Sequence, residues 1–490
     1  MSDPAATDRG GELGDRGGAV GLRTERGPVL LALMLATSLV AMDATILATA
    51  ASTIAGEFDA FARVPWLFSG YTLAQAVTVP VYGRLADVLG RKRLMMLGIG
   101  LFLTGSVLCA LAPTMTVLIA SRVVQGLGAG AIMPMSMTIA SDIFTIAERA
   151  KAQGYLSSVW AIASVAGPTL GGVFSQFISW RWIFWINIPL ALAAAAMILR
   201  RFEEPQREGE REPIDLVGAV LLTAGSTLVV LGLLQGGEWG WLTARTVAVI
   251  VIGVVVLGLF GWRARRVDYP ILDLKVIGRR IIWATTLVSF MVGVIVLGLS
   301  TYVPIYAQGV LGATPLVAGF ALAALSVGWP LTSTYSGRVY LRIGFRYTGL
   351  LGALLVLGGA GLALLLGTGT PIWQVGLTCF VIGAGMGLTA SPTLIAAQSS
   401  VGWEQRGAVT GTNVFSRSLG SAVGVAAFGA VVNAVASTGP DGMPSGAGLA
   451  AGVHLVFWCT VGVAVLLVIG VLLMPPDRPY RPSRPVRRAR

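Results

Sequence analysis

The sequence predicts an all-α integral membrane protein with fourteen spans: two six-helix bundles related by an internal repeat, and two helices inserted between them. Three observations predict this fold class. The 490 residues are 55% hydrophobic and only 12% charged, whereas a soluble domain carries about 25% charged residues. Fourteen apolar runs each approach the length of about 20 residues that crosses a bilayer. Glycine-flanked charged stretches recur in the two halves of the chain.

The apolar runs place the spans in order along the chain. They lie near residues 28–54, 65–86, 94–112, 115–140, 152–174, 183–200, 214–235, 245–262, 281–303, 316–336, 348–367, 372–394, 407–433 and 450–474. We expect a disordered cytoplasmic N-terminal tail (1–27), an N-terminal six-helix bundle (28–200), cytoplasmic linkers with two inserted helices (201–280), a C-terminal six-helix bundle (281–474) and a basic cytoplasmic tail (475–490). The first apolar run is long enough to span, so it is not interpreted as a cleavable signal peptide.

The distribution of Lys and Arg predicts the orientation of the spans. The predicted outer loops hold only Arg63, Arg181 and Arg245, while the inner segments hold most of the 35 basic residues. This bias places both termini in the cytoplasm, with the chain as a multi-pass protein of the plasma (inner) membrane. The net charge of +12 is therefore a topology signal aided by contact with membrane lipids, and no nucleic-acid partner is expected.

The chain offers no site for catalysis, a metal or ATP. Its cysteines lie in separate apolar runs, and its single histidine, His454, has no Ser and Asp partners in an evident triad. No lysine stands in a phosphate-binding P-loop. The stretch "GLGAGA" at 126–131 lies inside a span, where small residues allow close helix packing. We therefore expect no cofactor and an ion gradient as the energy source.

Two sets of residues repeat at nearly constant offsets. Gly83 and Gly90 recur 254 positions later as Gly337 and Gly344. A second set recurs 257 positions later: Arg149 with Arg406, Gly154 with Gly411 and Gly167 with Gly424. Spans one to six and nine to fourteen are thus two copies, with spans seven and eight inserted. Parallel repeats of this kind are typical of transporters that rock two bundles about a central site.

Several ordered motifs resemble the major facilitator superfamily. "GRLADVLGRKR" (83–93) resembles its loop between helices two and three, "RVVQGLGAGAIMP" (122–134) its fourth-helix motif, and "GYLSSVWAIASVAGPTLGG" (154–172) its antiporter motif. "MDATI" (42–46) and "WRWIFWINIP" (180–189) resemble the drug/proton antiporter branch with fourteen spans, the multidrug efflux type. Ala48, Ser52 and Ala163 depart from these motifs, and spans nine to fourteen hold no acid, whereas some multidrug members have one there.

The resemblance implies a gate in the charged loop, formed by Gly83, Asp87, Gly90 and Arg91. We expect tight turns at the two glycines. In the family the acid of this loop, here Asp87, docks toward the start of span thirteen, near Gly407. A helix N-terminus favours an anion. The second copy of the loop has Leu341 near the position equivalent to Asp87, so the gate is predicted to be one-sided.

Asp43 is the predicted proton site, with Arg122 as its partner. Asp43 is the only acid well inside a span, and a buried carboxylate is costly and usually functional. Arg122 keeps its proton, so it can hold Asp43 ionised. We expect protonation of Asp43 and substrate binding to compete. The alternative is an acid that only contributes to helix packing and is neutralised by a neighbour.

The antiporter motif and the predicted cavity complete the expected site. Gly154, Gly167, Pro168, Gly171 and Gly172 make span five kinkable and closely packed, which in the resembled family marks exporters. The cavity between the bundles is expected to include Thr45, Met133, Trp160, Tyr306, Asn413 and Arg417. Such a lining suits a lipophilic small molecule. Arg417 either balances the field of the second bundle or contacts an anionic group of the substrate.

These observations predict a non-enzymatic, monomeric transporter that binds protons and a lipophilic small-molecule substrate. The first hypothesis is a proton-coupled antiporter that exports drugs, antibiotics or an endogenous metabolite by alternating access. The alternative on the same fold is a lipid or glycolipid translocator of the cell envelope. A sensor or channel without coupled transport leaves Asp43, Arg122 and the antiporter motif without a shared purpose.

Overall fold

The computed structural model describes residues 20–60, 63–204, 213, 215–435 and 446–476, and every regular element in these residues is a helix. The first bundle contains α1 (Gly27–Glu57), α2 (Val64–Leu89), α3 (Arg91–Ala110), α4 (Met115–Ile143), α5 (Ile146–Val173), α6 (Trp182–Trp185) and α7 (Asn187–Arg201). The predicted tails outside residues 20–476 and the linker residues 205–212 and 214 lie outside the described residues.

The remaining helices form the insertion and the second bundle. The insertion contains α8 (Leu216–Trp239) and α9 (Ala244–Ala264), followed by the short α10 (Leu274–Ile277). The second bundle contains α11 (Arg280–Gly309), α12 (Pro315–Ile343), α13 (Phe345–Ala363), α14 (Ile372–Ser399), α15 (Arg406–Val435) and α16 (Gly446–Leu472). Within the described chain, thirteen helices are long and apolar enough to cross a membrane. The 26-residue α2 is the additional long helix, consistent with fourteen spans.

The sixth predicted span is formed by α6 and α7 together. The chain forms a short π-helix at Phe174–Ile178, and Ile186 then joins α6 to α7 with helical dihedral angles. The WRW sequence at residues 180–182 is bound to the end of α1. The Trp180 indole and the Arg181 guanidinium donate to the two carboxylate oxygens of Glu57 at 2.6 and 2.8 Å.

Side-chain caps fix where several helices begin. The hydroxyls of Thr114, Thr243 and Thr314 accept hydrogen bonds from backbone N–H groups three residues later, at the starts of α4, α9 and α12. Asp215 does the same for α8. Such caps satisfy N–H groups that have no partner inside the helix.

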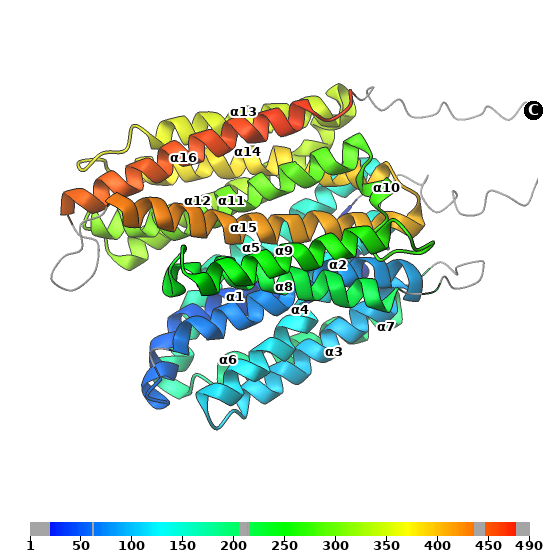
Figure 1. Ribbon diagram of the computed structural model, residues 1–490, viewed down its shortest axis with the longest axis horizontal. Helices are drawn as coiled ribbons and strands as arrows, with labels where there is room; N and C mark the ends of the chain where they lie inside the picture. Colours follow the sequence, from blue (N-terminus) through cyan, green and yellow to red (C-terminus); the bar gives the residue numbers. More distant parts are fainter. Residues whose placement is uncertain (1–19, 61–62, 205–212, 214, 436–445, 477–490) are drawn as a thin grey trace, which may run out of the picture.

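The two bundles lie side by side, and α8 and α9 lie along the boundary between them (Figure 1). We call the end at which α1 and α3 begin and α16 ends the basic end, because it carries the Arg91–Arg93 stretch. It is the end that the sequence predicts to face the cytoplasm. The α8 helix packs on α2 of the first bundle and α15 of the second. The inserted pair is therefore part of the helical assembly and bridges its two halves.

Three glycines on α4 allow the first bundle to pack closely. A Cβ on Gly128 would lie 2.3 Å from the Phe102 nitrogen of α3, closer than real side chains allow. Cβ atoms on Gly126 and Gly130 would meet α2. The interpretation of "GLGAGA" as a close-packing motif is confirmed.

The second bundle repeats this arrangement. On α14, Gly383 and Gly387 face α12, and Gly385 faces α13. A Cβ on Gly385 would lie 2.6 Å from the Gly352 carbonyl oxygen, just as a Cβ on Gly128 would lie 2.6 Å from the Gly98 carbonyl oxygen. Gly352 is 254 positions after Gly98, so the two contacts are equivalent in the repeat. The internal repeat therefore extends to individual helix contacts.

The bundles meet through two pairs of helices, α2 with α15 and α5 with α12. Gly83 of α2 faces Gly407 and Gly411 of α15, and Gly154 of α5 faces Thr334 of α12. These are equivalent contacts of the repeat, because Gly154 and Gly411 correspond. Both lie toward the basic end, and the bundles diverge toward the opposite end (Figure 1).

Candidate functional site

Asp43 and Arg122 form an ion pair inside the first bundle. The Arg122 guanidinium lies 2.5 Å from Asp43 Oδ2, and each residue is only 1% exposed. Asp43 is on α1 and Arg122 on α4, so the pair joins two helices. The sequence predicts this partnership, and the structure contains it; the role in proton transfer remains a prediction.

Gln125 connects both members of the pair. Its amide donates to Asp43 Oδ1 at 2.9 Å, while its carbonyl oxygen accepts from Arg122 at 2.6 Å. The same amide also lies 2.9 Å from the Ser106 hydroxyl on α3. A buried charge is tolerated only when it is paired and hydrogen-bonded, and Gln125 supplies the hydrogen bonds that the two ions leave open.

Tyr71 and the backbone of α2 hold the other side of Arg122. The guanidinium carbon lies 4.1 Å from the centre of the Tyr71 ring, which is a cation–π distance. The Arg122 Nε–H donates to the Leu67 carbonyl at 3.2 Å. The buried Tyr71 hydroxyl has no hydrogen-bond partner among the described residues. The ring of Tyr71, rather than its hydroxyl, therefore supports the pair.

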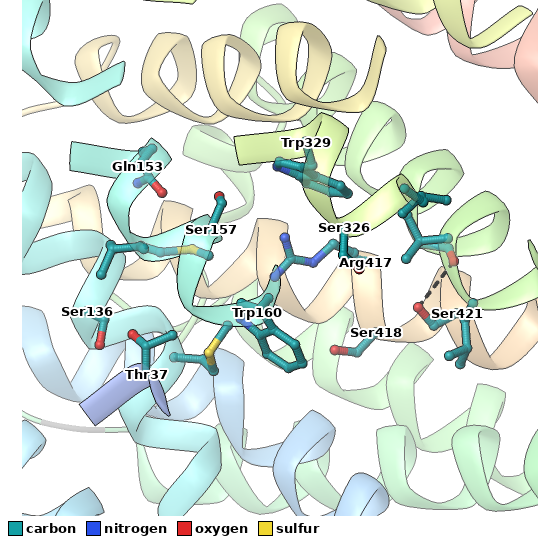
Figure 2. Close-up of a pocket in the computed structure, with 17 residues that line it drawn as sticks. Thr37, Ser136, Gln153, Ser157, Trp160, Ser326, Trp329, Arg417, Ser418 and Ser421 are labelled. Atoms are coloured by element: carbon teal, nitrogen blue, oxygen red, sulfur yellow. Dashed lines mark hydrogen bonds between the residues drawn. The ribbon is translucent and has the colours of Figure 1, made fainter. Parts of the chain in front are cut away.

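A cavity of about 320 Å³ lies between the bundles, near the middle of the helices. Its walls come from α1, α4 and α5 on one side and from α11, α12 and α15 on the other. Figure 2 shows two indoles, Trp160 and Trp329, on opposite sides of the space. The polar lining is mostly hydroxyl: Thr37, Ser136, Ser157, Ser326, Ser418 and Ser421, with the amide of Gln153. The volume suits one drug-sized molecule.

Arg417 is the one charged residue among the described residues that line the cavity. Figure 2 shows its guanidinium in the space between Trp160 and Trp329. The backbone of Arg417 is held close to α11, because a Cβ on Gly293 would lie 2.0 Å from the Arg417 carbonyl oxygen. The helix position is thus fixed, and the side chain extends into the cavity.

The other predicted cavity residues divide into two groups. Met133 and Trp160 line the cavity with Arg417. Thr45 instead donates its hydroxyl to the Ala163 carbonyl, between α1 and α5. Tyr306 lies at another depression, where its hydroxyl donates to the Gly367 carbonyl at 2.7 Å. Asn413 accepts a hydrogen bond from Ser289 at 2.8 Å, in a small pocket that also includes Arg417.

Asp87 connects the two bundles at the basic end. Its carboxylate accepts hydrogen bonds from the Gly407 and Ala408 backbone nitrogens, at 2.9 and 2.8 Å. These N–H groups belong to the first turn of α15, where an anion is also favoured by the helix dipole. The contact is the one that the family resemblance implies for this acid.

An ionic network surrounds this contact. Arg91 donates to Asp87 at 3.0 Å and to the Trp403 carbonyl at 2.5 Å, and its guanidinium lies 3.5 Å from the centre of the Trp403 ring. Asp142 forms ion pairs with Arg91 at 3.3 Å and with Arg406 at 2.9 Å. Asp87 and Asp142 both pair with Arg91 inside the first bundle, and the three residues bind Trp403, Arg406, Gly407 and Ala408 of the second. The network therefore joins the two bundles at the basic end.

The equivalent corner of the repeat is built differently. The first turn of α5 is capped by its own residues, because Thr145 and Glu148 form a capping box. From α12, the Tyr340 hydroxyl donates to the Ile146 carbonyl, and Leu341 packs in the apolar cluster beside it. An acid from the other bundle is therefore not needed to satisfy this helix start.

The expected tight turn at Gly83 is wrong. Gly83 lies inside α2, which continues to Leu89, and a Cβ there would come within 2.5 Å of the Gly407 carbonyl oxygen. The absence of a side chain at Gly83 allows the two bundles to approach closely. The expectation holds for Gly90, whose φ of +99° favours glycine. Its counterpart Gly344 has a φ of +91°.

Most described glycines of the antiporter motif are contact points on α5. A Cβ on Gly154 would meet Thr334 at 1.9 Å, one on Gly167 would meet Thr45 at 2.0 Å, and one on Gly171 would meet Thr49 at 2.2 Å. Gly172 has open space around it, and the side chain of Pro168 lies outside the described residues. The motif therefore packs α5 against α1 on one side and α12 on the other.

A family model described as Major Facilitator Superfamily matches residues 33–425. The chain belongs to the major facilitator superfamily. It is accordingly a multi-pass membrane transporter and not an enzyme.

Two bacterial relatives of this transporter cover most of its length. The multidrug transporter protein MdtP of Bacillus subtilis is 32% identical over 420 residues, which cover 84% of this chain and 76% of the relative. Multidrug resistance protein 3 of the same organism is 33% identical over 407 residues, covering 82% and 79%.

Solved structures share the fold of this transporter. The human organic anion transporter MFSD10 superimposes with a TM-score of 0.64 at 18% identity, over 91% of this chain and 99% of that one. The proton:xylose symporter XylE gives 0.64 at 14% identity, over 90% and 94%.

Sequence reasoning missed three residues that the structure places in these sites. Gln125 stands one helical turn after Arg122, a spacing that puts both on one face of a helix. Trp329 is the indole opposite Trp160. Asp142, near the end of α4, pairs with Arg406, a residue that belongs to the internal repeat.

Proposed function

We propose that this transporter exports lipophilic small molecules, such as drugs, antibiotics or an endogenous metabolite, in exchange for protons. In this proposal the basic end faces the cytoplasm, the membrane is the plasma membrane, and a single chain is the working unit. The two Bacillus relatives whose names refer to multidrug transport support the substrate class. The cavity supports it as well, because indoles and hydroxyls around a drug-sized space suit lipophilic molecules.

The observation that carries proton coupling is the buried Asp43–Arg122 pair. Its helices, α1 and α4, also supply cavity walls, through Thr37 and Met133. Thr37 is six residues before Asp43, or about 9 Å along the helix. The pair is therefore outside the cavity, and coupling acts through movement of α1 and α4 rather than through direct contact between Asp43 and the substrate.

The chemistry requires that the pair open during the cycle. While Arg122 and Gln125 hold Asp43, its carboxylate is compensated by the guanidinium and accepts a hydrogen bond from the amide. A shift of α4 relative to α1 would leave the carboxylate alone in an apolar bundle, where the neutral, protonated form is favoured. Arg122 keeps its charge throughout. One proton that crosses 100 mV supplies about 2.3 kcal/mol, enough for roughly a fifty-fold concentration ratio of a neutral solute.

The test is transport by purified protein in liposomes with an imposed pH gradient. A panel of lipophilic fluorescent dyes and one fluorescent phospholipid would be followed with and without a protonophore. We expect the wild type to concentrate dyes only with the gradient. Asp43→Asn should still bind dye but should no longer concentrate it.

Two results would count against the proposal. Gradient-driven accumulation by Asp43→Asn would remove Asp43 as the coupling site. Movement of the phospholipid without movement of any dye would favour the lipid translocator. Thr45→Ser is a matched control on α1, since it keeps the hydroxyl that bonds to the Ala163 carbonyl and should transport like the wild type.

A further inference from the structure

The charge inside the cavity is not compensated by any described part of the protein. Arg417 makes no hydrogen bond or ion pair with a described residue, unlike Arg122 in the first bundle, which has both. The other described lining residues are neutral. Asp43, the acid well inside a span, is already paired with Arg122 and is not among the residues that line the cavity. The cavity therefore presents one net positive charge.

Such a charge is costly in the middle of a membrane protein. Desolvating a cation without a partner is unfavourable, and ionisable residues inside spans normally face a partner, a pathway or a ligand. The guanidinium extends into the space between two indoles instead of packing against its own helix (Figure 2). A ligand that brings a negative charge would provide the missing partner.

The surrounding groups specify the remainder of that ligand. Trp160 comes from the first bundle, and Trp329 and Arg417 come from the second. A flat aromatic or apolar body fits between the indoles, and its acidic group would lie at the guanidinium, which binds carboxylates through paired N–H donors. The Ser326 hydroxyl lies in the same lining and can donate a hydrogen bond to an anion bound there.

We propose that the cavity selects lipophilic substrates that carry a single negative charge, and that Arg417 binds that charge. The inference rests on the proposed export function and makes its substrate class specific. Because Trp160 comes from the first bundle and Trp329 and Arg417 come from the second, one bound molecule contacts both halves of the transporter. Arg417 is then a specificity-determining residue, and its charge is not merely a balance for the field of the second bundle.

The experiment compares two probes with one skeleton, pyrenebutyrate and its neutral amide. Equilibrium binding to the full chain in lipid nanodiscs is measured without any gradient. We expect the wild type to bind the acid more tightly than the amide. Arg417→Gln should weaken binding of the acid by about tenfold or more, the usual scale for losing a charge-assisted hydrogen bond. Binding of the amide should change little.

Matched variants separate recognition from structure. Arg417→Lys keeps the charge and should retain most of the preference for the acid. Thr301→Ala removes a hydroxyl of α11 that lies outside the cavity and donates to the Leu297 carbonyl of its own helix, so the preference should be unchanged. An equal loss of both probes in Arg417→Gln, an unchanged affinity for the acid, or a wild type without preference would each overturn the inference.

A parallel transport measurement distinguishes this inference from the proposed function. If binding of the acid depends on Arg417 but no probe moves with the pH gradient, the proposed function fails and the site assignment stands. If the gradient drives the amide and the acid equally, with equal affinities, export stands and the selectivity for anions fails.

Discussion

At the scale of single residues, the buried pair is a network of three side chains. Arg122 and Asp43 contribute the charges. Gln125 donates to the second carboxylate oxygen of Asp43 and accepts a hydrogen bond from the Arg122 nitrogen that pairs with Asp43. Removal of one member of a buried network leaves its partners desolvated and unpaired, which costs more than the bond itself contributes. Gln125 is therefore predicted to matter although it carries no charge.

Replacement of Gln125 by Leu should destabilise the protein by about 1 to 3 kcal/mol. The reason is that Asp43 would lose a donor and Arg122 an acceptor, with no water to replace them. Thermal unfolding in detergent, followed by tryptophan fluorescence, measures the loss. Tyr71→Phe is the matched control, because it removes a hydroxyl that has no described partner and keeps the ring over Arg122. If both variants unfold at the same temperature, the network account is wrong.

The sequence predicts Asp43 and Arg122 because charges inside apolar runs are conspicuous. It does not predict Thr45 and Tyr306 correctly as cavity residues, because hydroxyls inside spans have two equivalent uses. Thr45 donates to a neighbouring backbone carbonyl, and Tyr306 donates to a loop carbonyl near the helix end. The rotation of each helix about its own axis decides whether such a hydroxyl packs against a neighbouring helix or lines the cavity. That rotation depends on contacts between segments that are distant in sequence.

At the scale of helices, the glycines of α4 and α14 set the distance between neighbours. Without a hydrophobic driving force in lipid, helices associate through close packing of small residues. The contact of Gly128 with α3 and that of Gly385 with α13 are equivalent in the two bundles. The repeat in sequence is therefore visible as a repeat in helix spacing.

Gly128→Ala should destabilise the first bundle, because the new methyl would lie 2.3 Å from the Phe102 nitrogen and α3 would have to move away. The expected cost is about 1 to 3 kcal/mol, the range for overpacking a closely packed contact. Gly100→Ala is the control on α3, since nothing lies within 4 Å of its Cβ position. It should be neutral or stabilising by up to about 1 kcal/mol. Equal unfolding temperatures for the two variants would contradict the spacing argument.

The helix boundaries show where sequence reasoning stops at this scale. The apolar runs locate the long helices, but the run at 152–174 gives no sign of the π-helix at Phe174–Ile178 that follows α5. The charged stretch at 83–93 was expected to be a loop, and most of it is helix, interrupted at Gly90. Charged residues can lie inside a helix when their ionic partners are on other helices. Those partners are far away in the sequence, so the sequence alone does not identify them.

At the scale of the whole molecule, the two contacts between bundles are related by the repeat but differ in chemistry. Between α2 and α15, Asp87 crosses the interface and satisfies the start of α15. Between α12 and α5, the start of α5 is already capped by Thr145 and Glu148. The closed basic end therefore depends on ionic contacts at one corner and on apolar packing at the other.

The inserted helices add to this asymmetry. The α8 helix lies against α2 and α15, the corner that contains Asp87, and an apolar cluster that includes Leu222 and Phe260 fastens it there. Asp215 at the start of α8 also pairs with Arg263 of α9 at 2.8 Å. The sequence predicts the insertion, but it does not predict which corner the insertion covers.

The asymmetry predicts that one acid governs the closed state. Asp87→Asn should open the basic end more often, because an amide offers one acceptor oxygen where the carboxylate offers two and cannot pair with Arg91. The loss is about 1 to 3 kcal/mol of the closed state, or roughly a five- to hundred-fold change in its ratio to the open state. Spin labels on α2 and α15 report the distance across the basic end, and dye transport in liposomes should fall in parallel.

Leu341→Ala, at the equivalent corner, removes only part of an apolar contact and should shift the distance distribution much less, with similar amounts of folded protein for both variants. Equal shifts from the two substitutions would show that both corners hold the closed state, and the one-sided gate would then be wrong.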